Sequence, residues 1–188
     1  HLHVERDEYK TIISNDKWYA ISGARRIGKT SLLKHVEQYY KKRKDTHVYI
    51  KSINTNRIKN TSFSEVFELG FQVLDHLSEI TNLTFEKDKI HNASQFKEAF
   101  IKQIEFLSNN KESFLLILDE VDVYLRSIDE IYKKEDKENG HELFNCFRDI
   151  KINSGFRIII AGFMRLYNYI ENPSVETENE KIKSPWIG

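Results

Sequence analysis

The chain has 188 residues, of which 39% are hydrophobic and 31% are charged. This composition is ordinary for a soluble globular domain large enough to bury a core. Lys and Arg together number 29, and so do Asp and Glu. The overall charge therefore gives no electrostatic support for a nucleic-acid partner. The longest apolar stretches, Phe114–Leu118 and Ile158–Met164, are too short to cross a bilayer, which excludes a membrane span.

Two further observations concern location and chain length. The single cysteine, Cys146, excludes an internal disulfide, and no charged-then-apolar leader opens the chain, so we expect a cytoplasmic protein. The sequence begins His1-Leu2-His3 without methionine and stops at Gly188, shortly after Pro185-Trp186. We therefore expect residues 1–188 to be one domain of a larger multidomain protein.

Apolar runs alternate with amphipathic patterns, which is typical of an α/β domain with a mostly parallel sheet. In chain order, the predicted elements are a strand at Trp18–Ser22, a helix from about Lys29 to Lys42, a strand at Thr46–Ile53, helices near Ser62–Ile80 and Ala93–Ser108, a strand at Phe114–Leu118, an exposed loop at Ile131–Gly140, a helix at Leu143–Ile152, a strand at Arg157–Ala161, a helix at Leu166–Ile170 and a loop at Glu171–Lys183. The run Phe114–Leu118 is apolar on both faces, which indicates a central strand covered on both sides.

A glycine-rich segment lies between the first predicted strand and helix. Its residues, Gly23, Ala24, Arg25, Arg26, Ile27, Gly28, Lys29 and Thr30, match G-x-x-x-x-G-K-[ST] at every fixed position. The two glycines allow a backbone whose amides point inward, and the helix N-terminus adds its own N–H groups. A glycine-rich helix start without a ligand is the alternative. The pattern favours a phosphate-binding loop.

Side chains of this loop have separate predicted roles. Lys29 supplies a point charge for the β- and γ-phosphates, and Thr30 offers a hydroxyl to Mg²⁺. Ser31 is in reach of the α-phosphate. The side chains of Arg25 and Arg26 are expected to point to solvent, and the alternative is that either one binds phosphate.

The second predicted site follows the buried strand Phe114–Leu118. Asp119 is expected to hold Mg²⁺ through a water, and Glu120 to orient and deprotonate the attacking water. Because adjacent strand residues point to opposite faces, one carboxylate can serve the metal and the other the water. Asp122 is expected to cap a helix. GTP is the alternative nucleotide, but Asn110-Lys-Glu-Ser113 lacks the final Asp of a guanine-reading Asn-Lys-x-Asp element, which favours ATP.

Together these segments resemble the archaeal-type ATPases and the related STAND signalling ATPases, which are neighbours of the AAA+ proteins. The resemblance lies in a phosphate loop (Walker A) at Gly23–Leu33, an acidic strand (Walker B) at Leu115–Asp122, a segment leading into a sensor strand at Gly140–Arg148 and Gly155–Gly162, a box before the first strand at Val4–Glu8, and a Ser-Pro-aromatic element at Ser184–Trp186.

The resemblance implies a three-layer fold with strand order 5-1-4-3-2, in which Arg157–Ala161 lies between the phosphate-loop strand and the acidic strand. The last strand and a lid are expected to be truncated. The resemblance also implies that Arg6 lies near the adenine or ribose. Arg148 is either structural or an arginine finger acting on a neighbouring subunit, and Arg165 forms a surface salt bridge or senses the γ-phosphate.

Three functions remain open from the sequence. The resemblance implies a switch domain of a signalling or antiviral defence protein, which binds and hydrolyses ATP with Mg²⁺ and forms a homo-oligomer on activation. A DNA-transaction ATPase, such as an origin-binding or transposition regulator, shares the same motifs. An ATP-binding scaffold with little turnover is the third. The dense basic run Lys41–Lys44 is expected to be a solvated helix C-terminus.

Overall fold

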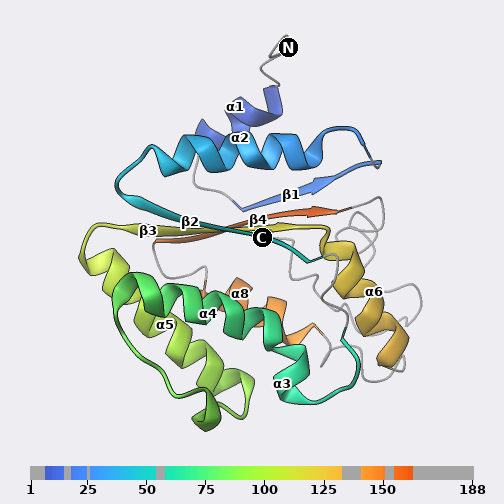
Figure 1. The fold of residues 1–188 in the computed structure, drawn as a ribbon, viewed down its shortest axis with the longest axis vertical. Helices are drawn as coiled ribbons and strands as arrows, with labels where there is room; N and C mark the ends of the chain where they lie inside the picture. Colours follow the sequence, from blue (N-terminus) through green and yellow to red (C-terminus); the bar gives the residue numbers. More distant parts are fainter. Residues whose placement is uncertain are drawn as a thin grey trace, which may run out of the picture.

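The computed structural model describes residues 7–14, 18–24, 26–53, 58–132, 141–150 and 155–162. These segments form three layers, with a four-stranded sheet between two layers of helices (Figure 1). Among the helices in these segments, none combines the length and the apolar character that crossing a bilayer requires.

The sheet is wholly parallel within the described segments. Its strands are β1 (Tyr19–Ser22), β2 (Thr46–Ser52), β3 (Ser113–Asp119) and β4 (Phe156–Gly162), in the spatial order β1-β4-β3-β2. The strand β4 therefore lies between the phosphate-loop strand and the acidic strand. This confirms the expected order for four of the strands. The residues after β4, where a fifth strand would follow, lie outside the described residues.

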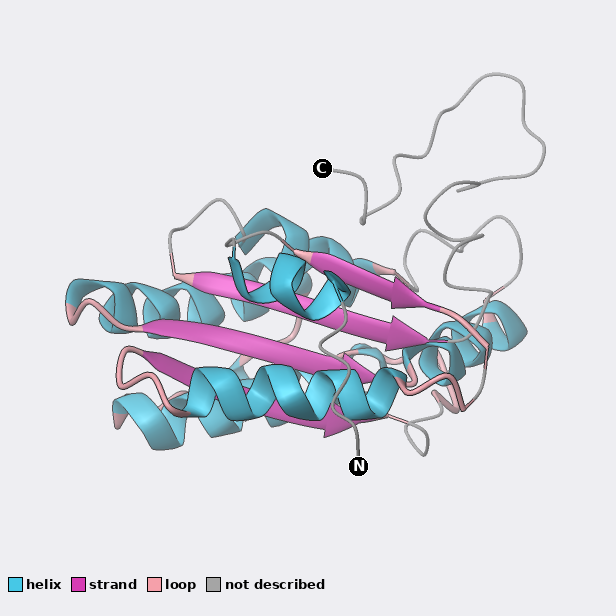
Figure 2. Cartoon of the chain, turned by 90° about the horizontal axis from the view of Figure 1, so that it is seen from above, coloured by secondary structure: helices cyan, strands magenta, loops and turns pink. Residues whose placement is uncertain are grey.

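The register brings the carboxyl ends of the strands to one edge of the sheet. Ser22 pairs with Gly162 at the end of β1 and β4, and Ser52 pairs with Asp119 at the end of β2 and β3. The four strand arrows point the same way in Figure 2. In open α/β sheets this edge is where ligands bind.

The helices cover both faces of the sheet. The helices α1 (Asp7–Ser14) and α2 (Lys29–Lys41) lie on one face, as Figure 1 shows. On the other face lie α3 (Phe63–Val66), α4 (Glu68–Thr81), α5 (Ala93–Asn109) and α8 (Glu142–Ile150). The helix α6 (Val121–Ile131) starts directly after β3, and a 3-10 turn, Lys87–Lys89, lies between α4 and α5.

Each face of the sheet packs into its own core. Leu115 and Ile117 of β3 join the core beneath α1 and α2, whereas Leu116 and Leu118 join the larger core beneath α4, α5 and α8. All four side chains are at most 1% exposed. Burial of each such side chain contributes about 1.5–3 kcal/mol. The prediction that this strand is covered on both sides is confirmed.

Several predicted boundaries need correction. The helix predicted at Ser62–Ile80 is two helices, α3 and α4, separated at Phe67, where ψ is 4°. The fully buried Phe67 ring stacks on Phe63 at 4.3 Å and meets Phe96 at 5.0 Å, so the break coincides with tight aromatic packing. The helices α1 and α6 were not predicted. The predicted helix at Leu166–Ile170, the predicted loop at Glu171–Lys183 and most of the predicted loop at Ile131–Gly140 lie outside the described residues.

Candidate functional site

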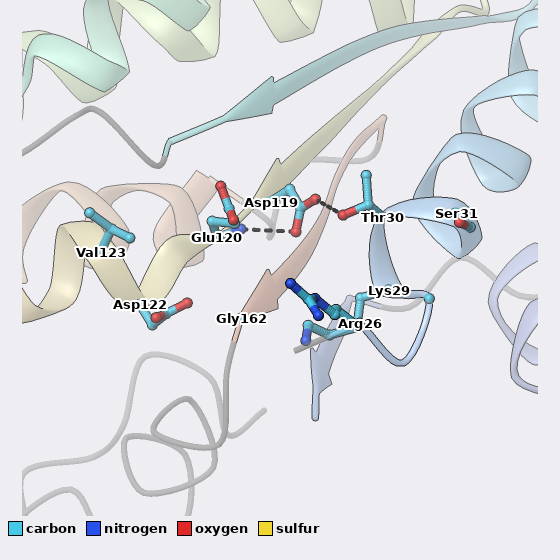
Figure 3. A pocket seen from close by; sticks show the side chains of 10 residues that line it. Arg26, Lys29, Thr30, Ser31, Asp119, Glu120, Asp122, Val123 and Gly162 are labelled. Atoms are coloured by element: carbon cyan, nitrogen blue, oxygen red, sulfur yellow. Dashed lines mark hydrogen bonds between the residues drawn. The ribbon is translucent and has the colours of Figure 1, made fainter. Parts of the chain in front are cut away.

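A cleft of about 630 Å³ opens at the carboxyl edge of the sheet, between the glycine-rich loop and the start of α6. Residues from the loop, from the first turn of α2, from the ends of β3 and β4 and from α6 line it (Figure 3). They are Arg26, Gly28, Lys29, Thr30, Ser31, Asp119, Glu120, Asp122, Val123 and Gly162.

The backbone of the loop favours glycine at one of its two glycine positions. Gly28 has φ of 91°, a left-handed backbone that favours glycine. A Cβ on Gly23 would meet Cδ1 of Ile27, the end of an exposed side chain that can move aside. Because Gly28 precedes α2 and has no side chain, no side-chain cap satisfies the first N–H groups of that helix. They can therefore bind an anion.

Lys29 is held across the loop by backbone oxygens. Its Nζ donates hydrogen bonds to the carbonyl oxygens of Gly23 at 2.7 Å and Ala24 at 2.8 Å. The ammonium group is thus positioned at the mouth of the loop by atoms of the loop itself. A bound phosphate oxygen would compete with these two carbonyls for its donors.

Thr30 and Asp119 join the loop to the end of β3. The Thr30 hydroxyl donates to Oδ2 of Asp119 at 2.6 Å, and Oδ1 of Asp119 accepts from the backbone N–H of Glu120 at 2.9 Å. Asp119 is buried, with only 5% of its surface exposed. A hydroxyl and a carboxylate are hard oxygen donors of the kind that Mg²⁺ accepts together with phosphate oxygens.

The number of carboxylate ligands that a Mg²⁺ site needs is small. Within the part of the chain that the structure describes, no cluster of three or more Asp, Glu, His or Cys side chains could hold a metal. Mg²⁺ in phosphate-handling sites typically takes one or two carboxylates and completes its octahedron with waters and phosphates. Thr30 and Asp119 are therefore the residues that would hold it.

Glu120 reaches the cleft by a different route from the one expected. It does not continue the strand: its φ of 60° and ψ of 37° place it in the left-handed region, at the position preceding α6. Asp119 and Glu120 both line the cleft (Figure 3), and the argument from strand alternation does not apply to Glu120, because it lies outside β3.

The Glu120 carboxylate has one described side-chain partner that the sequence did not single out. The Ser52 hydroxyl, at the end of β2, donates to Oε2 of Glu120 at 3.1 Å. Because β2 and β3 are parallel neighbours in register, Ser52 lies beside Asp119 at the same sheet edge. The position of a polar residue at the end of a neighbouring parallel strand is the signal that could have found it.

Asp122 is not a helix cap, which corrects the prediction. Glu120 occupies the cap position of α6, and Asp122 lies within the first turn, 7% exposed. Its Oδ2 accepts from Nη2 of Arg126, one helical turn on, at 3.1 Å. It is a third carboxylate at the cleft, already matched by a guanidinium.

The other predicted site residues fall in three groups. Ser31 lines the cleft, and so does Arg26, for which both a solvent-facing side chain and a phosphate contact were left open. Arg148 lies on α8, 3.7 Å from Oδ1 of Asp149, and does not belong to the cleft lining. Arg6, Arg25 and Arg165 lie outside the described residues. The chemical roles assigned to all of these residues stay predictions.

Two of the four basic residues in the run Lys41–Lys44 pair with acids. The helix ends at Lys41, which pairs with Glu37 at 2.7 Å. Arg43 donates twice to Asp45, at 3.1 and 3.0 Å, and this lowers the pKa of the Asp45 carboxyl to about 2. The run is exposed at the C-terminus of α2, as predicted, and Lys41 and Arg43 have local counter-charges.

Comparisons with known proteins support the fold. No protein-family model and no curated protein sequence matches the chain. Among solved structures, a Walker-type ATPase of Pyrococcus abyssi is similar with a TM-score of 0.55 and 17% identity, over 98% of this chain and 51% of that one. The ORC2 protein of Aeropyrum pernix, solved as ADPNP–ADP complexes, gives a TM-score of 0.49 and 16% identity, over 92% of this chain and 45% of that one.

This chain therefore spans about half the length of these solved structures. The likeness to the Walker-type ATPase extends to the fold, an α/β fold with a parallel sheet of the P-loop type.

Proposed function

We propose that this chain is the ATP-binding and ATP-hydrolysing domain of a larger protein. The observation that carries the proposal is the 2.6 Å hydrogen bond between Thr30 of a complete phosphate loop and Asp119 at the end of the central strand. That contact joins the two motifs that phosphoryl-transfer chemistry needs at one sheet edge. Lys29 and Glu120 line the same cleft.

Each residue has a defined task in this proposal. The loop amides and Lys29 bind the phosphates, and Thr30 and Asp119 hold Mg²⁺, which neutralises phosphate charge when bound. Glu120 accepts a proton from the water that attacks the γ-phosphate. Ser52 holds the Glu120 carboxylate in place through the hydroxyl contact at 3.1 Å.

The first test is nucleotide binding. Calorimetric titration of the wild-type chain with ATP and Mg²⁺ is expected to give saturable binding. Lys29→Ala should weaken it by about 100-fold, because each hydrogen bond to a charged group contributes about 1.5–3 kcal/mol. Lys34→Ala is the matched control, since Lys34 is an exposed lysine of the same helix that does not line the cleft.

Two results of the binding experiment would contradict the proposal. If Lys29→Ala binds ATP as tightly as the wild-type chain, the phosphate-loop assignment is wrong. If the wild-type chain binds no nucleotide, the proposed function falls as a whole.

A narrower proposal concerns what the ATPase is for. The resemblance of the motifs to STAND-type ATPases supports a switch domain, in which ATP favours an assembling state and hydrolysis resets it. Lys41 and Arg43 pair with acids, which reduces the positive charge that the run Lys41–Lys44 offers to DNA. An ATP-binding scaffold would differ from the switch in one respect: it would retain nucleotide through purification while showing almost no steady-state turnover.

A further inference from the structure

Arg26 has a backbone conformation that arginine seldom adopts. Its φ is 65°, in the left-handed region, at the fourth position of the phosphate loop. Residues with a Cβ occupy this region at a cost in conformational energy, which glycine largely avoids. Such strain is concentrated at functional sites, so the outlier is a reason to ask what the arginine side chain does there.

The side chain points into the cleft and is uncommitted. Arg26 lines the cleft, and Figure 3 shows its guanidinium directed toward the side that carries Asp119 and Glu120. Within the described residues, its guanidinium has no hydrogen bond or ion pair. The other two cations of this region are both engaged: Lys29 with two carbonyl oxygens, and Arg126 with Asp122.

The charges of the cleft need a second cation. The carboxylates of Asp119 and Glu120 line it, in addition to Asp122, which Arg126 matches. A nucleoside triphosphate brings about four further negative charges, and one Mg²⁺ offsets two of them. Lys29 alone then faces an excess of negative charge. A guanidinium suits this position because its planar fork donates two parallel hydrogen bonds to a phosphate.

The position of Arg26 relative to Glu120 indicates which phosphate it meets. If Glu120 accepts a proton from the attacking water, the γ-phosphate must lie beside it. Arg26 approaches this space from the loop on the other side of the cleft (Figure 3). Its donors therefore face the space that the terminal phosphate would occupy.

We propose that the Arg26 side chain binds the terminal phosphate, so that the cleft selects nucleoside triphosphate over diphosphate. The same guanidinium then stabilises the negative charge of the transition state. The proposal rests on the proposed ATPase function. In hydrolysis, a water oxygen bonds to the γ-phosphorus while the bond to the bridging oxygen breaks and ADP leaves with the electron pair. Glu120 accepts the water proton. Arg26 exchanges no proton and neutralises charge on the γ-phosphate oxygens.

The test uses Arg26→Gly, which removes the guanidinium and suits the left-handed backbone. The nucleotide-free variant should unfold thermally no lower than the wild-type chain, because glycine relieves the strain. Calorimetry with Mg²⁺ should show about tenfold weaker ATP binding and unchanged ADP binding, corresponding to loss of one charged contact. Its kcat should fall by roughly 100-fold. Arg26→Lys should recover part of the ATP preference, and Lys34→Ala should keep all of it.

Failure of this inference is distinguishable from failure of the proposed function. If Arg26→Gly weakens ATP and ADP binding equally, or weakens the binding of neither nucleotide, Arg26 does not bind the terminal phosphate. The chain would still be an ATP-binding domain. If the wild-type chain binds neither nucleotide, both proposals are overturned together.

Discussion

The hydroxyl of Ser52 is the described side-chain contact that fixes the Glu120 carboxylate, across two neighbouring strands. Glu120 is exposed, so without this donor its side chain would sample other rotamers. A water-activating carboxylate must keep a defined position relative to the γ-phosphate, since small displacements are costly in rate. Ser52 is thus a positioning residue in the proposed mechanism.

Ser52→Ala should therefore lower kcat about three- to tenfold while leaving KM for ATP within about twofold, because the ground-state phosphate contacts are intact. Ser52→Thr, which keeps the hydroxyl, should restore the rate. Glu120→Gln supplies the reference: full ATP binding with hydrolysis abolished. A Ser52→Ala enzyme with wild-type kcat would show that the contact does not position the base.

Sequence patterns predicted much of the cleft but not how its side chains are arranged. Motif spacing identified Lys29, Thr30, Asp119 and Glu120, and the structure brings all four to one cleft. The hydrogen-bond donor Ser52 belongs to no motif, because its role depends on which strand neighbours β3. The orientation of Arg26 depends on a positive φ that no residue pattern shows at a non-glycine position.

Among the elements, α4 packs closely against two neighbouring helices at Gly70. A Cβ at this position would lie 2.6 Å from Cδ1 of Leu143 on α8 and 2.7 Å from Cζ of Phe96 on α5. The three helices meet inside the larger core, where both of these neighbours are fully buried. Absence of a side chain at this one position lets the helices pack closely.

Gly70→Ala is accordingly expected to destabilise the fold by about 1 kcal/mol. Alanine improves the propensity of a helix interior by about 1 kcal/mol, but overpacking a core costs about 1–3 kcal/mol. Urea unfolding would measure the difference. Asp75→Ala is the control, since Asp75 is exposed on the same helix and gains propensity without a clash. A Gly70→Ala protein more stable than the wild type would show that the interface relaxes at little cost.

Helices and strands were predicted correctly where the spacing of apolar residues and the residue composition indicate the same element. The helix α6 was missed although Val121, Tyr124, Leu125 and Ile128 recur at spacings of three and four, and all four are buried. The break between α3 and α4 is harder to predict, because apolar residues at helical spacing continue through Phe67. Tertiary aromatic packing, which local periodicity does not contain, accompanies that break.

At the scale of the whole molecule, the remaining question is whether nucleotide controls association. The chain carries equal numbers of basic and acidic residues, so net charge does not oppose contact between copies. Arg148 lies partly exposed on α8, away from its own cleft, and remains a candidate for contact with a neighbouring subunit.

If ATP favours an assembled state, Glu120→Gln should accumulate it, because that variant is expected to bind ATP without consuming it. Light-scattering mass measurements should then show a larger species with ATP and Mg²⁺ and a monomer with ADP. Lys29→Ala should stay monomeric with either nucleotide.

Thermodynamic linkage adds a second requirement: if ATP promotes association, association must tighten ATP binding by the same factor. The ATP affinity of Glu120→Gln should therefore rise with protein concentration, and a concentration-independent Kd together with an unchanged mass would contradict nucleotide-controlled assembly by this domain.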